Sequence, residues 1–499
     1  MLKYSLTEDD SWQFARLSGD FNPLHVDTVS ARRLQFGGTI CHGVHLVLKA
    51  LDLAIESGLL ACAQINTIKA VFSGSVRTGS PVDVDLIREP GSDRVRLVAT
   101  SDARAVFTVK LSVVDLLVGR QLWLGPLPQL GEPAARSEPL CPEFPATATL
   151  ASLASHEPLR VNQDLMLRLL PSLADSSHGL QFTADLMATT RIIGMKCPGL
   201  HSIYSEFNLQ RRAADSEVTD NRMPYSIQRA DPRFRSIRVV VTGGTLEGTL
   251  DAFFRAPPVA QPLLSHLKAS IAPARFSGQR ALVVGGSRGL GELVVKILLA
   301  GGARVVLSFV WGKADAERIQ EEAQALGHQV DVLQLDASQT LPEASVELLG
   351  SMNLTHLYYF ATQKISKSPG PAWNAGLFDN FCQLYVHGFA ALVRAAAQKS
   401  SATHRLKVFY PSTVFLDQPE SGFPEYRAAK AAGETLCDNL SLNPALVLCK
   451  PRLPRLQTDQ NSSFLGVEGV EAFPLMLQQV ELLHPTDAHP LTSSTFVSK

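Results

Sequence analysis

The strongest constraint on the fold lies in a glycine-rich stretch beyond the middle of the chain. A short apolar run, Ala281-Leu282-Val283-Val284, leads directly into a glycine-rich turn that opens a predicted helix. A strand, a glycine turn and a helix in this order are typical of a parallel sheet that binds a dinucleotide, because glycine lets the backbone approach the pyrophosphate. The candidate cofactor-binding residues in this stretch are Gly285, Ser287, Arg288, Gly289, Leu290 and Gly291.

The alternation of strands and helices continues after this turn. Further strands are predicted at 305–309, 330–335, 356–360, 406–410 and 445–449, most of them separated by segments of helical pattern. We therefore expect residues 276–499 to form an α/β Rossmann domain with a doubly wound parallel sheet.

Tyr426 and Lys430 form a candidate catalytic pair in this domain. They stand four residues apart in a predicted helix, so they share one face of it. We expect the Lys430 ammonium group to lower the pKa of the Tyr426 phenol, which then donates a proton to a carbonyl as hydride arrives. Ser412 and Thr413 end a predicted strand upstream, and either one offers a hydroxyl to hold that carbonyl.

With this Y-x-x-x-K pair and the glycine-rich turn, residues 276–485 resemble the short-chain dehydrogenase/reductase family, in particular a β-ketoacyl reductase. The resemblance leaves the hydroxyl residue open, because Thr413 has the common spacing and Ser412 is the more usual residue type. The chain departs from the family where Phe360-Ala361-Thr362-Gln363 replaces Asn-Ala-Gly. His387 stands where the family usually has a proton-relay asparagine, and it either relays protons or packs as an ordinary side chain.

The residues after the second strand of this domain favour NADPH over NADH. Leu307-Ser308-Phe309 carries no acidic side chain for the ribose hydroxyls of NAD, whereas Arg288 in the glycine-rich turn suits a 2′-phosphate. Asp336 follows the third strand and is expected near the adenine. The rest of the expected cofactor-binding set is Ser308, Asp336, Ala361 and Lys430.

A second chemical signature lies near the N terminus. Asp20 and His25 stand five residues apart on a loop stiffened by Asn22-Pro23, so they can converge on one water molecule as a general acid/base pair. Gly43 lies where a helix is predicted to begin. Its backbone N–H, together with the helix dipole, suits the polarisation of a thioester carbonyl and the stabilisation of an enolate.

The sequences D-F-N-P-L-H-V-D at 20–27 and F-G-G-T-I-C-H-G at 36–43 resemble the MaoC-like, (R)-specific enoyl-CoA hydratase family. The resemblance implies a hot-dog fold, in which an antiparallel sheet wraps around one long helix. It also implies that Asp20 and His25 are the catalytic dyad. Asn22 then falls on the supporting position and Gly43 on the carbonyl-binding amide.

The helix-and-strand pattern around this motif occurs twice. A helix at 43–57 precedes four strands of period two, and a helix at 183–194 precedes four more, at a spacing of roughly 140 residues. The second copy lacks the D-x-N-P-L-H-x-D motif, so we expect an inactive half that supplies a partner sheet edge and part of an acyl channel.

The expected fold class is therefore an α+β double hot dog followed by an α/β Rossmann domain. The expected boundaries are residues 1–120 for the catalytic hot-dog domain, 121–149 for a proline-rich linker, 150–256 for a degenerate hot-dog domain, 257–275 for a second linker and 276–499 for the Rossmann domain.

Composition limits the compartment and the partners. Lys and Arg (46) nearly balance Asp and Glu (47), which argues against a nucleic-acid or membrane-surface role. The seven cysteines include no C-x-x-C, so no metal site is expected and a reducing cytoplasm fits best. No apolar run reaches the ~20 residues of a membrane span, and the N terminus lacks the apolar core of a signal peptide. A homodimer remains open as the assembly.

These observations together predict a bifunctional acyl-thioester enzyme. A 3-ketoacyl thioester on coenzyme A or an acyl-carrier protein would be reduced by NADPH at Tyr426, then dehydrated by Asp20 and His25, in fatty acid or polyketide assembly. Two alternatives stay open. One is an enoyl-CoA hydratase plus 3-hydroxyacyl-CoA dehydrogenase that runs both steps in reverse in β-oxidation. The other is a hydratase whose reductase-like domain is a non-catalytic docking module.

Overall fold

The computed structural model describes residues 2–34, 36–62, 65–88, 91–102, 104–114, 127, 153–212, 221–255, 257–365, 373–459, 462–463, 466–467 and 469–484. The chain divides at Pro257 and Pro258 into two compact units. The linker expected at 121–149 lies outside the described residues, apart from Leu127. None of the described helices combines the length and the apolar character that a bilayer span requires.

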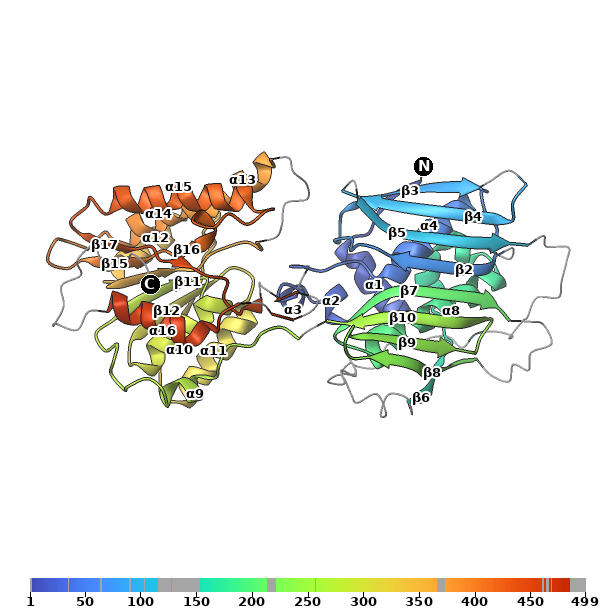
Figure 1. The fold of residues 1–499 in the computed structure, drawn as a ribbon, viewed down its shortest axis with the longest axis horizontal. Coiled ribbons are helices and arrows are strands. Elements are labelled where there is room, and N and C mark those ends of the chain that lie inside the picture. The colour runs from blue at the N-terminus through green and yellow to red at the C-terminus, as the bar shows by residue number, and fades with distance from the viewer. Residues whose placement is uncertain are drawn as a thin grey trace. The chain divides into compact units, whose positions relative to one another are not determined.

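The first unit is built on one antiparallel sheet of ten strands, in the order β1-β3-β4-β5-β2-β7-β10-β9-β8-β6 (Figure 1). β2 and β7 pair at its centre, so the two predicted hot-dog halves join edge to edge as expected. The strands are β1 (Leu2–Ser5), β2 (Ile65–Phe72), β3 (Pro81–Arg88), β4 (Arg94–Ser101), β5 (Arg104–Val113), β6 (Ala154–Pro158), β7 (Ser202–Arg211), β8 (Arg222–Asp231), β9 (Ser236–Val241) and β10 (Leu246–Phe254).

One long helix belongs to each half of this unit. α4 (Gly43–Glu56) and α8 (Ser177–Arg191) both bury apolar side chains in a core shared with the sheet, including Val47 of α4 and Phe182 of α8. α8 begins earlier than the predicted helix at 183–194, because the Ser176 side chain accepts from a first-turn N–H and caps it. The remaining helices are α1 (Glu8–Ser18), α2 (Pro23–Val26), α3 (Thr28–Ala31), α6 (Gln163–Leu169), α7 (Pro171–Ala174) and the π-helical η2 (Ile192–Lys196).

The second unit contains a parallel sheet of six strands in the order β13-β12-β11-β14-β15-β17. This is a doubly wound Rossmann order, in which β11 and β14 flank the switch point where dinucleotides bind. The predicted fold class is thus confirmed. The strands are β11 (Arg280–Val284), β12 (Arg304–Phe309), β13 (Val330–Gln334), β14 (His356–Tyr359), β15 (Leu406–Phe409) and β17 (Leu446–Cys449), with the two-residue pairs β16 (Ser412–Thr413) and β18 (Arg452–Leu453), and β19 (Ser462–Ser463) and β20 (Gly466–Val467).

Two groups of helices cover the two faces of this sheet (Figure 1). The first group is α9 (Leu264–Lys268), α10 (Gly289–Ala300), α11 (Lys313–Ala325) and α16 (Ala472–Leu483). The second group is α12 (Glu343–Ser351), α13 (Ala375–Cys382), the π-helical η3 (Gln383–Gly388), α14 (Phe389–Ala396), the 3-10 segment η4 (Val414–Leu416) and α15 (Pro424–Leu440).

The segment 257–275, expected as a linker, belongs to the second unit. Leu264 and Leu267 lie on one face of α9, and Ile271 follows shortly after the helix ends. All three are buried in the core that contains α10. Pro257, Pro258 and Pro262 therefore precede a packed helix.

Candidate active sites

Asp20 and His25 lie on the turn between α1 and α2 in the first unit. Gly19 ends α1 with a φ of +79°, a conformation that glycine adopts without strain. Asn22 then caps α2, with its Oδ1 accepting from the Leu24 N–H at 3.1 Å. The local sequence therefore fixes the path of the loop that carries the predicted dyad.

Asn22 also ties this loop to the second half of the unit. Its Nδ2 donates to the Gly194 carbonyl at 3.1 Å, with the carbonyls of Gly199 and Leu200 at 3.3 and 3.4 Å. The Asn22 side chain is buried. The supporting position predicted from the motif thus makes a contact that spans 172 residues of sequence.

The Asp20 carboxylate is buried and held at both oxygens. Oδ1 accepts from the Asn22 N–H at 3.2 Å, and Oδ2 accepts from Thr190 Oγ1 at 2.7 Å. Burial raises the pKa of Asp20, while the proximity of His25 and the Thr190 hydrogen bond act to lower it. Asp20 therefore holds a proton more readily than an exposed aspartate does.

His25 is held in one tautomer by a backbone carbonyl. Its Nδ1 lies 2.8 Å from the Ile40 oxygen, and because a carbonyl only accepts, Nδ1 donates. The neutral ring then carries its lone pair on Nε2. Burial lowers the pKa of His25, which favours this neutral form. The ring is thus prepared to accept a proton at Nε2.

His42 joins this pair, although the sequence prediction omits it. Its Nε2 donates to the Asp20 carbonyl at 2.9 Å, and its ring stacks on His25 with a centroid distance of 3.9 Å. One side-chain atom from each residue, a carboxylate oxygen of Asp20 and a ring nitrogen of His25 and of His42, lies within 4.8 Å of the other two. The F-G-x-x-I-x-H-G motif contains His42, so the sequence carried the information needed to find it.

Gly43 begins α4 directly after His42. A Cβ at this position would lie 2.8 Å from the Phe72 ring, so a side chain would force that ring to move. The Gly43 N–H belongs to the first helical turn, which has no intrahelical acceptor and carries the positive end of the helix dipole. The predicted carbonyl-binding amide is therefore adjacent in sequence to the ring stacked on His25.

The glycine-rich turn of the second unit lies between β11 and α10. φ is +74° at Gly285 and +59° at Gly289, and a Cβ on Gly291 would lie 2.2 Å from the Gly285 carbonyl oxygen. Ser308 supports the turn, because its buried Oγ accepts from the Gly285 N–H at 3.1 Å. Ser308, predicted as a cofactor-binding residue, therefore has a hydrogen-bonding role within the protein. Because its glycines carry no side chains, the backbone of this turn can approach a dinucleotide pyrophosphate closely.

Arg288 lies just before α10 and already has an acidic partner. Its Nη1 pairs with Asp459 Oδ2 at 3.2 Å, and the Asp459 side chain is buried. A 2′-phosphate at Arg288 would therefore compete with Asp459 for the guanidinium group.

The other predicted cofactor residues make contacts within the second unit. Asp336 Oδ1 accepts from the backbone N–H and the hydroxyl of Ser338, so it shapes the loop after β13. Ala361 follows Phe360, whose carbonyl carbon lies 3.0 Å from where a Gly285 Cβ would stand. Ser287 is buried, and Leu290 packs against the core of the unit.

Tyr426 and Lys430 lie on α15, but the lysine does not activate the phenol as predicted. The Tyr426 hydroxyl forms a hydrogen bond with Thr413, and burial raises the pKa of Tyr426 to about 12. Lys430 Nζ donates to the Pro411 carbonyl at 2.7 Å and lies 3.9 Å from the centroid of the Tyr385 ring. Burial lowers the pKa of Lys430 to about 7. The predicted lowering of the phenol pKa is therefore wrong here, because desolvation favours the neutral form of both groups.

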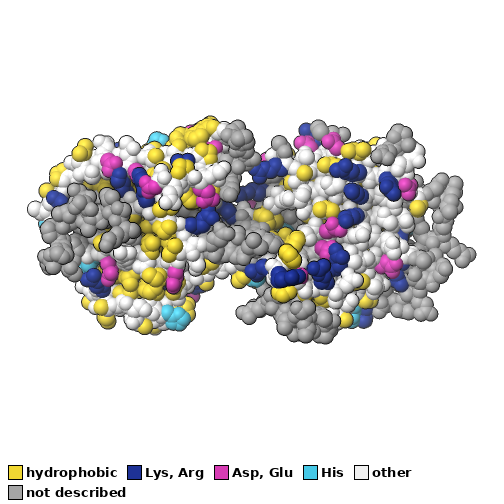
Figure 2. All heavy atoms as spheres, in the orientation of Figure 1, with side chains coloured by type: hydrophobic (Ala, Val, Ile, Leu, Met, Phe, Trp, Pro, Cys, Tyr) yellow, Lys and Arg dark blue, Asp and Glu magenta, His cyan; other side chains and the backbone are white. Residues whose placement is uncertain are grey.

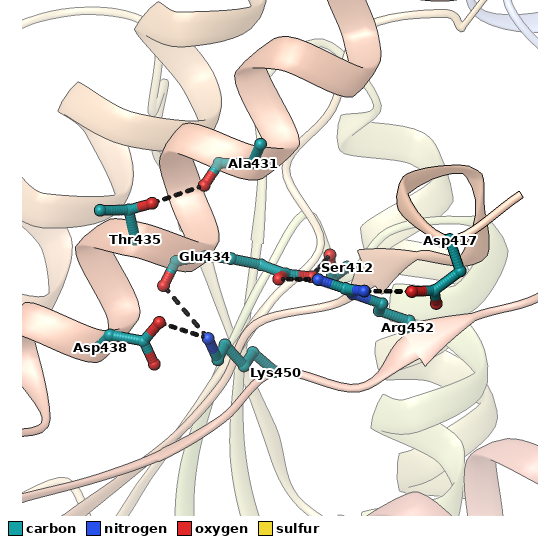
Figure 3. A network of polar contacts seen from close by, with 8 residues as sticks. All are labelled: Ser412, Asp417, Ala431, Glu434, Thr435, Asp438, Lys450 and Arg452. Carbon is teal, nitrogen blue, oxygen red and sulfur yellow. Dashed lines mark hydrogen bonds and ion pairs between the residues drawn. The ribbon is translucent and has the colours of Figure 1, made fainter. Parts of the chain in front are cut away.

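Ser412 has partners of its own (Figure 3). Its Oγ donates to Glu434, which accepts from Arg452 through both carboxylate oxygens at 2.9 and 2.7 Å. Arg452 also pairs with Asp417. These contacts connect β16 to β18 and to α15. Of the two candidate hydroxyls, the one at Tyr426 is therefore that of Thr413.

His387 lies on the π-helical segment η3 and is exposed, so it does not face buried Tyr426. Tyr385, two residues earlier, is buried beside Lys430, and its hydroxyl bonds to Thr362 Oγ1 at 2.5 Å. A π-helical turn changes which residues share a helix face. The prediction, which assumed a regular helix, therefore missed Tyr385.

Comparison with known proteins gives independent matches for both units. Residues 2–104 match the family model for the MaoC like domain, and residues 279–445 match that for the short chain dehydrogenase. An uncharacterized oxidoreductase of Methylorubrum extorquens is 33% identical over 97 residues, which cover 18% of this chain and 39% of that protein. A short-chain dehydrogenase/reductase of Pestalotiopsis microspora is 37% identical over 67 residues, or 13% and 25%. The matches thus span well under two thirds of either relative.

Solved structures similar to this chain include two that contain NADP. A short chain dehydrogenase from Burkholderia cenocepacia in complex with NADP is 21% identical with a TM-score of 0.36, and the match covers 42% of this chain and 92% of that one. A 3-oxoacyl (acyl-carrier-protein) reductase from Agrobacterium tumefaciens with NADP bound is 20% identical with a TM-score of 0.32, covering 37% and 72%.

Proposed function

Because the chain joins a MaoC-like dehydratase domain (2–104) to a short-chain dehydrogenase domain (279–445), we propose that it is a bifunctional acyl-thioester enzyme. The short-chain dehydrogenase unit reduces a 3-ketoacyl thioester to a 3-hydroxyacyl thioester. The MaoC-like unit removes water from that product and gives a trans-2-enoyl thioester. The acyl chain is carried by coenzyme A or by an acyl-carrier protein.

The convergence of Asp20, His25 and His42 within 4.8 Å supports the dehydration step. His25 Nε2 accepts the proton from C2 of the substrate, and Asp20, whose pKa is raised, supplies a proton to the departing C3 hydroxyl. The C2–H and C3–O bonds break, the C2=C3 double bond forms, and water leaves. The Gly43 amide stabilises the negative charge that develops on the thioester oxygen.

The hydrogen bond between Thr413 and Tyr426 supports the reduction step. NADPH, when bound at the glycine-rich turn, supplies the hydride for C3. Thr413 holds the substrate carbonyl oxygen, and the Tyr426 hydroxyl donates a proton to it. The high pKa of Tyr426 keeps the phenol protonated at neutral pH, as this role requires.

The preference for NADPH rests on the residues near the glycine-rich turn. No acidic side chain occurs in Leu307-Ser308-Phe309 at the end of β12, and Arg288 lies in the turn itself. NADPH dependence favours synthesis, in fatty acid or polyketide assembly, over β-oxidation. A measured preference for NAD would instead favour the oxidative direction.

Two contacts favour a second candidate function, in which the second unit binds a partner without reducing it. Lys430 is engaged by the Pro411 carbonyl and Arg288 by Asp459. If Lys430 and Arg288 bind NADPH as we propose, both groups must change partners or share them. Fluorescence of bound nicotinamide during titration with NADPH separates the two candidates, since a docking module would give no signal.

The bifunctional proposal is tested with acetoacetyl and crotonyl thioesters on both carriers, each with NADPH and with NADH. Asp20→Asn should lower the hydration and dehydration rates by at least ~100-fold and leave ketoreduction intact. Tyr426→Phe should lower the rate of ketoreduction and leave hydration and dehydration intact. Loss of both activities in either variant would contradict the assignment of the two steps to separate sites.

A further inference from the structure

The half of the first unit that lacks the acid/base motif nevertheless contributes a side chain to Asp20. Thr190 lies near the end of α8, and its Oγ1 donates to Asp20 Oδ2 at 2.7 Å across 170 residues of sequence. Thr190 is 4% exposed and Asp20 is 1% exposed, so water does not take the place of this donor. The contact is therefore a fixed part of the site.

The residues after Thr190 enclose the same loop. Arg191 donates from Nη1 to the Ser18 carbonyl and from Nε to Glu157 at 2.6 Å. Gly194 approaches so closely that a Cβ there would lie 2.4 Å from Asp20 Oδ1. The end of α8 and the segment η2 thus pack directly against the Asp20 loop.

The carboxylate has one donor on each oxygen, and the two donors come from different halves of the unit. Oδ1 binds the Asn22 N–H of its own loop, whereas Oδ2 binds Thr190 of the second half. A carboxylate held at one oxygen only can rotate about its χ2 torsion, which is broad for aspartate. The Thr190 hydroxyl therefore removes the remaining freedom of Asp20 beside His25.

We propose that Thr190 is a positioning residue for the dehydration site, which fixes the Asp20 carboxylate in the orientation for proton transfer. This inference rests on the proposed lyase function and extends it. The second half of the double hot dog then takes part in catalysis, beyond supplying a sheet edge and part of a channel. In either direction of the reaction, Asp20 and His25 together hold one proton. The pH dependence of the rate therefore follows the apparent pKa values of this pair, and a change at Thr190 should alter it.

The charged and titratable groups around the carboxylate come from four elements. They are His25 on α2, His42 before α4, Arg191 on α8, and Arg255 after β10, which acts on His25. Burial raises the pKa of Asp20, and the Thr190 hydrogen bond is one of the interactions that lower it. Removal of this donor should therefore raise the acid-side apparent pKa of the pair.

The test is Thr190→Val in the full chain, which keeps the branched shape and removes the donor. With crotonyl thioester as substrate, we expect kcat to fall about tenfold at neutral pH, with a smaller change in KM. The acid limb of the pH profile should move up by about one pH unit. Thr190→Ser keeps the hydroxyl, and it should restore most of the rate and the wild-type limb.

Thr189→Val is the matched control, because Thr189 is equally buried on α8 but donates to the Leu186 carbonyl at 2.7 Å. It should leave the pH profile unchanged. If Thr190→Val does not fold, as judged by circular dichroism, Thr190→Ala is compared with Thr190→Ser instead. A wild-type pH profile in the donor-free variant would overturn the proposal. Absence of hydration in the wild-type chain would instead refute the lyase function itself.

Discussion

Thr413 and Ser412 are neighbours in sequence, but their hydroxyls bind different partners. Thr413 bonds to Tyr426, whereas Ser412 bonds to the Glu434 carboxylate that Arg452 holds. The contact with Tyr426 is made by the residue that spacing along the chain favours, and not by the one that residue type favours. Both partners lie on α15, but Tyr426 is two turns before Glu434, so the two neighbouring hydroxyls reach different parts of the helix.

This difference predicts unequal effects of two conservative changes. Thr413→Val removes the hydroxyl that we propose holds the substrate carbonyl, so we expect ketoreduction to fall by about 10²- to 10³-fold. Ser412→Ala removes a bond within the structural network of Figure 3 and should cost much less activity. The measurement is NADPH oxidation with acetoacetyl thioester. Equal losses in the two variants would show that Ser412 also serves the substrate.

The ion pair of Arg288 with Asp459 leads to a second residue-level prediction. Asp459→Asn removes the competing carboxylate from the guanidinium, so NADPH should bind more tightly, by roughly tenfold. NADH lacks the 2′-phosphate and should bind as before. Titration of both cofactors against nicotinamide fluorescence measures this. An equal gain in affinity for NADPH and NADH would show that the effect of Asp459 does not depend on the 2′-phosphate.

At the level of elements, periodicity predicts the long strands and both long helices of the first unit. It does not predict β1 and β6, which have four and five residues, because so short a run carries little pattern. It also misses the π-helical segments, one of which places Tyr385 at Lys430. The local sequence motif at 20–27 is sufficient to identify Asp20 and His25 as candidate site residues. The Thr190 contact joins two halves far apart in sequence, so no local pattern could indicate it.

Asp185 shows how one buried acid connects elements of the second half. It lies on α8 and accepts from the N–H and hydroxyl of Thr245, at the turn before β10. Burial raises the pKa of Asp185 to about 7. A raised folded-state pKa means that the stability linked to this group is fully present below the ordinary aspartate pKa of 3.8 and is lost as pH rises through about 7.

Asp185→Asn should therefore stabilise the first unit at pH 8 by several degrees in Tm and flatten its pH dependence between pH 5 and 8. The amide oxygen can still accept from Thr245, so the turn is retained. Calorimetry at several pH values measures the shift. Asp83→Asn is the control, because Asp83 forms an exposed ion pair with Lys3 and should change little. A destabilised Asp185→Asn variant at pH 8 would show that the ionised acid is needed.

At the level of the whole molecule, the two units act on the same carbon of the proposed substrate. Reduction places a hydroxyl on C3, and dehydration removes it. Asp20 lies in the first compact unit and Tyr426 in the second, so the residues proposed for each step belong to different units. In the proposed function, joining both units in one chain raises the effective concentration of the first product that is available to the second site.

We therefore expect the wild-type chain to differ from an equimolar mixture of Asp20→Asn and Tyr426→Phe. Each variant keeps one activity, so the mixture contains both but never on one chain. Starting from acetoacetyl thioester and NADPH at low protein concentration, the mixture should show a longer lag before enoyl thioester absorbance appears. Wild-type chains at half the concentration match the number of active sites. If the two lags are the same, the intermediate equilibrates with solvent and the fusion serves another purpose, such as equal production of both activities.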